Sequence, residues 1–128
     1  MFFSAGYFCQ MQKIKTFEDL IIWQKGIELS KNIYLITKEF PAEERYGLAN
    51  QIRRAVVSVP SNIAEGYGRR TSNDYRQFLH ISLGSLYEVQ TQLKIGYELN
   101  IISLENFSQA NNLAKEIDHM IYAITKKL

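Results

Sequence analysis

Apolar residues recur at alternating steps of three and four through most of this chain, and this periodicity constrains the fold more than any other feature. The clearest run lies near the end of the sequence and consists of Phe107, Ala110, Ala114, Ile117, Ile121, Ile124 and Leu128. Such spacing places apolar side chains on one face of an α-helix that packs at a shallow angle against other helices. We therefore predict a helix that starts near Leu104, with Ser103 as its cap.

Three further segments share this periodicity and are predicted to be helices. They cover residues 16–39, 43–66 and 71–99. Thr16 is a suitable cap for the first, and Pro41 ends it because the residue before a proline avoids the α region. Four helices with short connections predict an all-α, antiparallel up-down-up-down four-helix bundle over residues 16–128.

Pro60 lies inside the second predicted helix. Proline has no backbone N–H and clashes with the preceding turn, so we expect a kink at Pro60 or a break into two shorter helices. Ser58 and Ser61 flank the proline and are able to bond backbone groups locally. Gly66 and Gly68 are predicted to end the helix by supplying left-handed backbone geometry.

The first predicted helix carries apolar residues over an unusually wide arc. One side holds Leu20, Trp23, Ile27 and Tyr34, and the adjoining side holds Ile22, Gly26, Leu29, Ile33 and Ile36. The arc spans roughly 200°, which is wider than the single stripe of a surface helix. Either this helix is unusually buried in the monomer, or part of it contacts another subunit.

Composition indicates one ordinary globular domain. The chain has 128 residues, of which 46% are hydrophobic and 22% charged. Cys9 is the only cysteine, which excludes an intrachain disulfide and suits a reducing cytoplasm. Residues 1–15 are expected to be a poorly ordered extension, and Met11 is an alternative start to Met1. No segment has the ~20 consecutive apolar residues of a membrane helix, so we expect no membrane partner.

The arginines are confined to one part of the sequence. All six lie between residues 45 and 76, as Arg45, Arg53, Arg54, Arg69, Arg70 and Arg76. Arginine suits planar, bidentate contact with phosphate, and the nearby Tyr67 and Tyr75 are able to stack on bases. We therefore take five of them as candidate nucleic-acid-binding residues: Arg53, Arg54, Arg69, Arg70 and Arg76. The alternative is that they form structural ion pairs with Glu43, Glu44, Glu65, Asp74 and Glu88. Both interpretations stay open at this point.

No catalytic, metal or cofactor constellation emerges from the sequence. His80 and His119 are distant in sequence and have no cysteine or carboxylate at metal-ligand spacing. Gly66 and Gly68 lack the lysine–hydroxyl ending of a phosphate loop. We therefore expect a protein that is not an enzyme and has no cofactor.

Five runs of residues together form a specific sequence pattern. They are Phe17-Glu18-Asp19-Leu20, Arg45-Tyr46-Gly47-Leu48, Gln51-Ile52-Arg53-Arg54-Ala55, Ser58-Val59-Pro60-Ser61-Asn62-Ile63-Ala64-Glu65-Gly66 and Gly84-Ser85-Leu86. This pattern resembles a bacterial family of four-helix bundles that are often encoded within intervening sequences of 23S ribosomal RNA genes. The resemblance covers about residues 16 to 127 and implies a homo-oligomer, with a ring of five subunits as the expectation. It also implies a relation to the accessory variability protein of diversity-generating retroelements, which binds nucleic acid and a reverse transcriptase.

The matching residues also have physical roles that we predict directly. Pro60, Ser61, Asn62 and Gly66 are expected to shape the interruption and the end of the second helix. Glu65 is a candidate ion-pair partner for arginine. Gly84, next to Ser85, is expected to permit close approach of another helix. The leading functional hypothesis is a non-enzymatic homo-oligomer that binds RNA or DNA through its arginines, with a reverse transcriptase or another nucleic-acid enzyme as a further partner. The alternative hypothesis is a protein-interaction scaffold.

Overall fold

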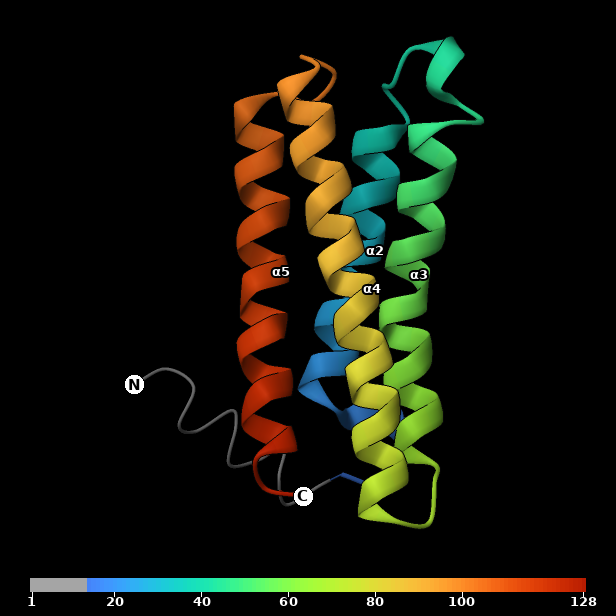
Figure 1. Ribbon diagram of the computed structural model, residues 1–128, viewed down its shortest axis with the longest axis vertical. Coiled ribbons are helices and arrows are strands. Elements are labelled where there is room, and N and C mark those ends of the chain that lie inside the picture. Colours follow the sequence, from blue (N-terminus) through green and yellow to red (C-terminus); the bar gives the residue numbers. More distant parts are fainter. Residues whose placement is uncertain (1–13) are drawn as a thin grey trace.

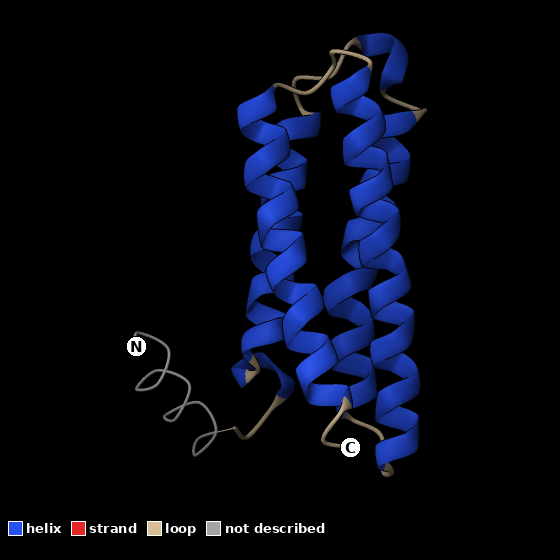
Figure 2. Cartoon of the chain, turned by 60° about the vertical axis from the view of Figure 1, so that its left-hand side comes forward, coloured by secondary structure: helices blue, strands red, loops and turns tan. Residues whose placement is uncertain are grey.

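The computed structural model describes residues 14–128, and every regular element in this range is helical (Figure 2). The elements in order are η1 (Phe17–Asp19), α2 (Ile21–Thr37), η2 (Ala42–Glu44), α3 (Leu48–Tyr67), α4 (Ser72–Glu98) and α5 (Leu104–Thr125). In Figure 1, α2 and α4 run upward whereas α3 and α5 run downward. The predicted all-α four-helix bundle is confirmed.

The four helices enclose a single apolar core. Helix α3 packs between α2 and α4, and α5 closes the bundle by packing against both α4 and α2. Each helix contributes fully buried side chains, such as Ile33, Ile52, Leu86 and Ile117. Burial of one such side chain stabilises the fold by about 1.5–3 kcal/mol, so the core is the main source of stability.

The first helix starts later than its sequence pattern predicts. Thr16 and Asp19 do form a capping box, in which Thr16 Oγ1 accepts a hydrogen bond from the Glu18 N–H at 3.2 Å. This box caps the single turn η1, however, and Leu20 is extended, with φ −74° and ψ 128°. The extended backbone buries the Leu20 side chain in the core, and α2 begins at Ile21.

Helix α3 continues through Pro60 without interruption, so the alternative of two shorter helices is wrong. Pro60 cannot donate to the carbonyl of Val56, and Ser30 Oγ from α2 donates to that oxygen instead at 3.3 Å. Gly26 lies directly against the proline ring, where an added Cβ would be 3.1 Å from Pro60 Cβ. Contacts from the neighbouring helix therefore compensate for the missing bond, and a kink at Pro60 stays a prediction.

The end of α3 does not use left-handed glycines, so that expectation is wrong. No glycine among the described residues has a positive φ, and Gly68 caps the helix at φ −80°. Gly66 lies inside the helix, where an added Cβ would be 2.6 Å from Phe78 Cβ. Its small size is required by the close approach of α4.

The wide apolar arc of the first helix is only half buried within the chain. Ile22, Leu29 and Ile33 are fully enclosed, whereas Ile27 and Tyr34 are 36% and 44% exposed. No helix among residues 14–128 has the length and apolarity needed to cross a membrane. The predicted extension at residues 1–15 falls almost wholly outside the described residues.

Candidate nucleic-acid interface

The five candidate arginines fall into two separate groups. Arg53 and Arg54 lie in the first half of α3, whereas the other three surround the connection between α3 and α4. Fifteen residues separate Arg54 from Arg69, which corresponds to about 22 Å at 1.5 Å per helical residue. The structure therefore does not gather all five into one site.

Arg53 is tied to the neighbouring helix α2. Its Nε donates to Thr37 Oγ1 at 2.7 Å, and one terminal nitrogen donates to the Tyr34 carbonyl at 3.3 Å. The guanidinium also lies over the Tyr34 ring, 4.5 Å from the ring centre. Thr37 is buried, so these contacts give Arg53 a structural role at the α2–α3 contact.

Arg54 lies in a polar groove between α3 and α4. The groove has a volume of about 430 Å³, and Glu88 and Ser58 are among its lining residues. Among residues 14–128, no ion pair within 4 Å includes Arg54 or Glu88. The Glu88 carboxylate instead accepts a hydrogen bond from Gln92 Nε2 at 3.3 Å. The groove thus holds one unpaired charge of each sign.

Arg69 is partly engaged with its own helix end. It bridges to Glu65 at 3.0 Å, four residues earlier, and its guanidinium lies 4.6 Å from the centre of the Phe78 ring. Both charged side chains are about half exposed, so the ion pair stabilises the fold only weakly. The Arg69 guanidinium is thus held over the Phe78 ring of α4, next to the connection between α3 and α4.

Arg70 is exposed, and no hydrogen bond, ion pair or aromatic contact of its side chain occurs within residues 14–128. Arg76, one turn into α4, donates to Asn73 Oδ1 at 2.8 Å. Thr71 caps α4 between them and accepts the Asp74 N–H at 3.1 Å. The unbonded N–H groups of this first turn reinforce the attraction for anions.

The charges of the two bundle ends differ in sign. We call the end formed by residues 14–20, 65–76 and 122–128 the basic end (lower in Figure 1). It carries six basic side chains (Lys15, Arg69, Arg70, Arg76, Lys126 and Lys127) against four acidic ones (Glu18, Asp19, Glu65 and Asp74). The acidic end, residues 36–48 and 94–106, carries three basic and five acidic side chains.

Tyr67 and Tyr75 pack within the chain rather than presenting their rings for stacking. The rings meet edge to face at 6.0 Å, and both side chains pack against the core. Burial, with a smaller contribution from Tyr67, raises the pKa of Tyr75 to about 12. These rings stiffen the basic end.

Two other ionisable groups have shifted pKa values. Burial, followed by the neighbouring Asp118 carboxylate, raises the pKa of Tyr87. The backbone N–H groups of Lys15 and then Thr16 lower the pKa of Asp19. Both shifts, like that of Tyr75, move away from neutral pH, so they do not suit these three groups to acid–base catalysis.

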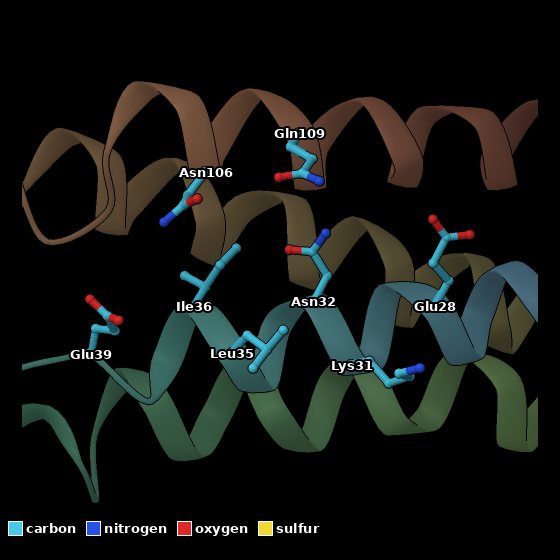
Figure 3. Close-up of a pocket in the computed structure, with 8 residues that line it drawn as sticks. All are labelled: Glu28, Lys31, Asn32, Leu35, Ile36, Glu39, Asn106 and Gln109. Atoms are coloured by element: carbon cyan, nitrogen blue, oxygen red, sulfur yellow. The ribbon is translucent and has the colours of Figure 1, made fainter.

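A second groove lies between α2 and α5 and has a volume of about 420 Å³ (Figure 3). It is lined by Glu28, Lys31, Asn32, Leu35, Ile36, Glu39, Asn106 and Gln109. Amides and aliphatic groups dominate the lining, and no nucleophile with an adjacent base is present in it. Among the described residues, no group of three or more His, Cys, Asp or Glu side chains is placed to hold a metal ion.

The predicted structural residues have separate local roles. Ser61 Oγ donates to the Val57 carbonyl at 2.8 Å, one turn back along α3. Asn62 Nδ2 and Ser85 Oγ both donate to Ser58 Oγ at 2.8 Å, which joins α3 to α4. Gly84 makes no close approach within the chain, since an added Cβ would meet nothing within 4 Å.

The sequence analysis missed three residues that position charged side chains of the candidate interface. Thr37 accepts from Arg53, Phe78 lies beneath Arg69, and Gln92 orients Glu88. Gln92 is only 6% exposed, and its Oε1 is the one buried side-chain polar atom among residues 14–128 without a hydrogen-bond partner. The sequence signal that could have identified Gln92 as a buried polar residue is its position next to the core residue Leu93.

Comparison with known proteins gave one matching family model and several solved structures of similar fold. A family model described as 23S rRNA-intervening sequence protein matches residues 18–123. A crystal structure of a protein with unknown function, from the S23 ribosomal protein family of Bacteroides thetaiotaomicron, superposes with a TM-score of 0.76 at 25% identity. The match covers 83% of this chain and 99% of that one. The search of curated proteins gave no match.

Proposed function

Since the chain belongs to the family of 23S rRNA-intervening sequence proteins, we propose that it is a non-enzymatic, homo-oligomeric, cytoplasmic bundle that binds RNA or DNA. The exposed guanidinium of Arg70 at the basic end is the observation that carries this proposal. Arg69 and Arg76 flank it and complete a set of three cations around the start of α4. A ring of five subunits is the expected assembly, and it would multiply this weak local charge.

The proposal divides the five candidate arginines by role. Arg69, Arg70 and Arg76 contact phosphates, because their planar groups suit bidentate bonds and Arg70 has no ion-pair partner within residues 14–128. Arg53 holds α2 against α3, and Arg54 belongs to the groove with Glu88. From the resemblance to retroelement accessory proteins, we also propose a reverse transcriptase or another nucleic-acid enzyme as a protein partner.

A salt-titrated binding assay tests the nucleic-acid part of the proposal. Fluorescence anisotropy is measured with labelled single-stranded RNA, double-stranded RNA and double-stranded DNA of equal length. Affinity should fall steeply between about 50 and about 200 mM salt, because phosphate contacts release counterions. Absence of binding to all three probes at the lowest salt would refute this function.

The second candidate function is a protein-interaction scaffold whose arginines are structural. The observations that favour it are the Arg69–Glu65 ion pair and the bonds from Arg53 to α2. This function predicts that Arg69→Ala and Arg70→Ala change assembly or stability while leaving nucleic-acid binding unaltered. Light scattering, thermal unfolding and anisotropy on the same two variants separate the functions.

A further inference from the structure

Gly84 is the one helical glycine among residues 14–128 whose missing side chain has no explanation within the chain. The four glycines inside helices are Gly26, Gly66, Gly84 and Gly96. A Cβ at Gly26, Gly66 or Gly96 would come within 3.1 Å of a side-chain carbon of another segment. Gly84 is exposed, lies in the middle of α4 and has open space around it, although a helix interior favours alanine over glycine. The surface at Gly84 is therefore open to close approach by another molecule.

Gly84 belongs to an exposed apolar strip on α4. We call Ile81, Gly84, Glu88 and Ile95 the α4 strip, since spacings of three, four and seven place them on one helix face. Ile81 and Ile95 are 51% and 44% exposed. Glu88 is the only charged residue of the strip.

A second exposed strip lies on α2. Ile27, Lys31 and Tyr34, which we call the α2 strip, follow spacings of four and three and therefore share a face. These residues are exposed, and the only charge of the strip is the positive one of Lys31. Among residues 14–128, Lys31 makes no ion pair within 4 Å. The two strips are thus apolar at their ends and opposite in charge at their centres.

The packing inside the chain places both strips at the same level along the bundle. Ser30 of α2 bonds to the Val56 carbonyl of α3, and Ser85 of α4 bonds to Ser58 of α3. Helices α2 and α4 run in the same direction, so Ile27 lies level with Gly84 to within about one residue, a rise of roughly 1.5 Å. One turn further along both helices, Lys31 lies level with Glu88.

We propose that the α2 strip of one copy binds the α4 strip of the next, with Ile27 over Gly84 and Lys31 paired with Glu88. The proposal deepens the proposed function, on whose homo-oligomer it rests. Two different strips form the contact, so each copy still has one strip of each kind free for a further copy. Because the strips are level, successive copies are related by rotation without a shift along the helices. Such contacts close into a ring rather than a filament.

The same geometry fixes which helix faces inward. Tyr34 lies on the α3 side of α2, since it carries Arg53, and Glu88 shares its groove with Arg54. Tyr34 and Glu88 therefore lie toward α3, whereas Lys31 borders the groove between α2 and α5. With Tyr34 and Glu88 on the side of the ring axis, the proposal places α3 on the inner side of the ring and α5 outside. Every basic end then lies on the same rim, which brings the Arg69, Arg70 and Arg76 sets of all copies together.

Charge reversal and charge exchange test the pairing. Molar mass is measured by light scattering for wild type, Lys31→Glu, Glu88→Lys and the double variant, with Lys115→Glu on the exposed face of α5 as the matched control. Each single variant should shift the assembly toward the 14.9 kDa single chain, whereas the double variant and the control keep the wild-type mass.

Gly84→Arg should also give single chains with unchanged helical circular dichroism, because the position is open within the chain.

The outcomes separate this inference from the function on which it rests. A wild-type protein that is monomeric at every concentration overturns the proposed homo-oligomer and the strip pairing together. An oligomer whose mass is unchanged by Gly84→Arg and by both single charge reversals overturns the strip pairing alone.

Cross-linking gives an independent test of the register. In a Cys9→Ser background, Ile27→Cys and Gly84→Cys are combined in one chain and treated with a short bifunctional maleimide. Level strips predict a ladder of covalent multimers in denaturing electrophoresis, up to the full ring. Neither single-cysteine variant should form a ladder, because each ring contact joins two different positions. An intact oligomer that yields no ladder with both cysteines present overturns the pairing.

Discussion

The basic end and the acidic end of the bundle are built from the same kinds of element, a one-turn helix and a short interhelical connection, yet their charges are opposite. In an antiparallel bundle each end holds two helix N-termini and two C-termini, so the helix dipoles largely cancel. The difference therefore comes from side chains. At the acidic end the single arginine, Arg45, follows Glu43 and Glu44 directly, whereas the Arg70 side chain at the basic end has no ion pair within residues 14–128.

Two of the four acidic residues at the basic end are engaged in structure. Asp19 accepts the N–H groups of Lys15 and Thr16, and Glu65 pairs with Arg69. The whole-chain net charge of +2 conceals this asymmetry. A modest overall charge thus coexists with one end that is suited to a polyanion.

Removal of the basic end's arginines is the change with the largest expected effect. The triple variant Arg69→Ala, Arg70→Ala and Arg76→Ala should weaken nucleic-acid binding by about a hundredfold at low salt, since three solvent-exposed charge contacts of about 1 kcal/mol each sum to about 3 kcal/mol. Anisotropy titration measures the effect. The matched control removes the three cations of the acidic end, Lys38, Arg45 and Lys94, and should change affinity less than about threefold. Equal losses in the two triple variants would show that the ends do not differ in function.

The two arginines in the first half of α3 give the second comparison. Arg53→Ala should lower the free energy of unfolding by about 2 kcal/mol, because the buried Thr37 oxygen loses its donor and Tyr34 loses its cation. Arg54→Ala, at the next position, should change it by less than about 0.5 kcal/mol. Urea unfolding at one protein concentration measures both, and affinity should stay near wild type for Arg53→Ala. A similar stability loss for the two variants would contradict the structural role assigned to Arg53.

The helices were predictable because the signals that specify them are local. Apolar periodicity located all four, and Ser103 caps α5 as expected. Thr71, the first residue of the predicted third helix, caps α4. The late start of α2 was not predictable, because burial of Leu20 in the assembled core decides it. Continuity through Pro60 depends on Ser30, which is 26 residues away in sequence.

The roles of the arginines could be predicted only in part. Confinement to one sequence segment was visible, but Arg53 and Arg54 point about 100° apart on a helix and meet different neighbours. The partner of Arg53 is Thr37, which no spacing rule identifies. Glu65 was expected to pair with an arginine, and the four-residue spacing to Arg69 produces that pair.

The caps of α4 and α5 allow the ends to be compared with equal structural changes. Thr71→Ala at the basic end and Ser103→Ala at the acidic end each remove one side-chain cap, so each should lower the free energy of unfolding by about 1 kcal/mol. Thr71→Ala should also weaken nucleic-acid binding, because the cap fixes the turn that follows Arg70. Urea unfolding and anisotropy on both variants measure the two effects. Equal nucleic-acid affinities for the two variants would show that the α4 cap does not contribute to the binding surface.

The smallest expected effect concerns Asp19, and it depends on pH. Because the folded state lowers the pKa of Asp19 below 3.8, its carboxylate contributes stability at neutral pH that is lost as the pH falls through the folded-state pKa. Wild type should therefore be more stable than Asp19→Asn at neutral pH, and the difference should shrink in acid. Urea unfolding at both pH values measures this, with Glu18→Gln as the control for simple loss of charge in the same turn.

Asp19→Asn also raises the net charge of the basic end by one, so at neutral pH it should strengthen nucleic-acid binding slightly while weakening the fold. A variant in which affinity and stability fell together would show that the capped turn, rather than the charge of this end, governs binding.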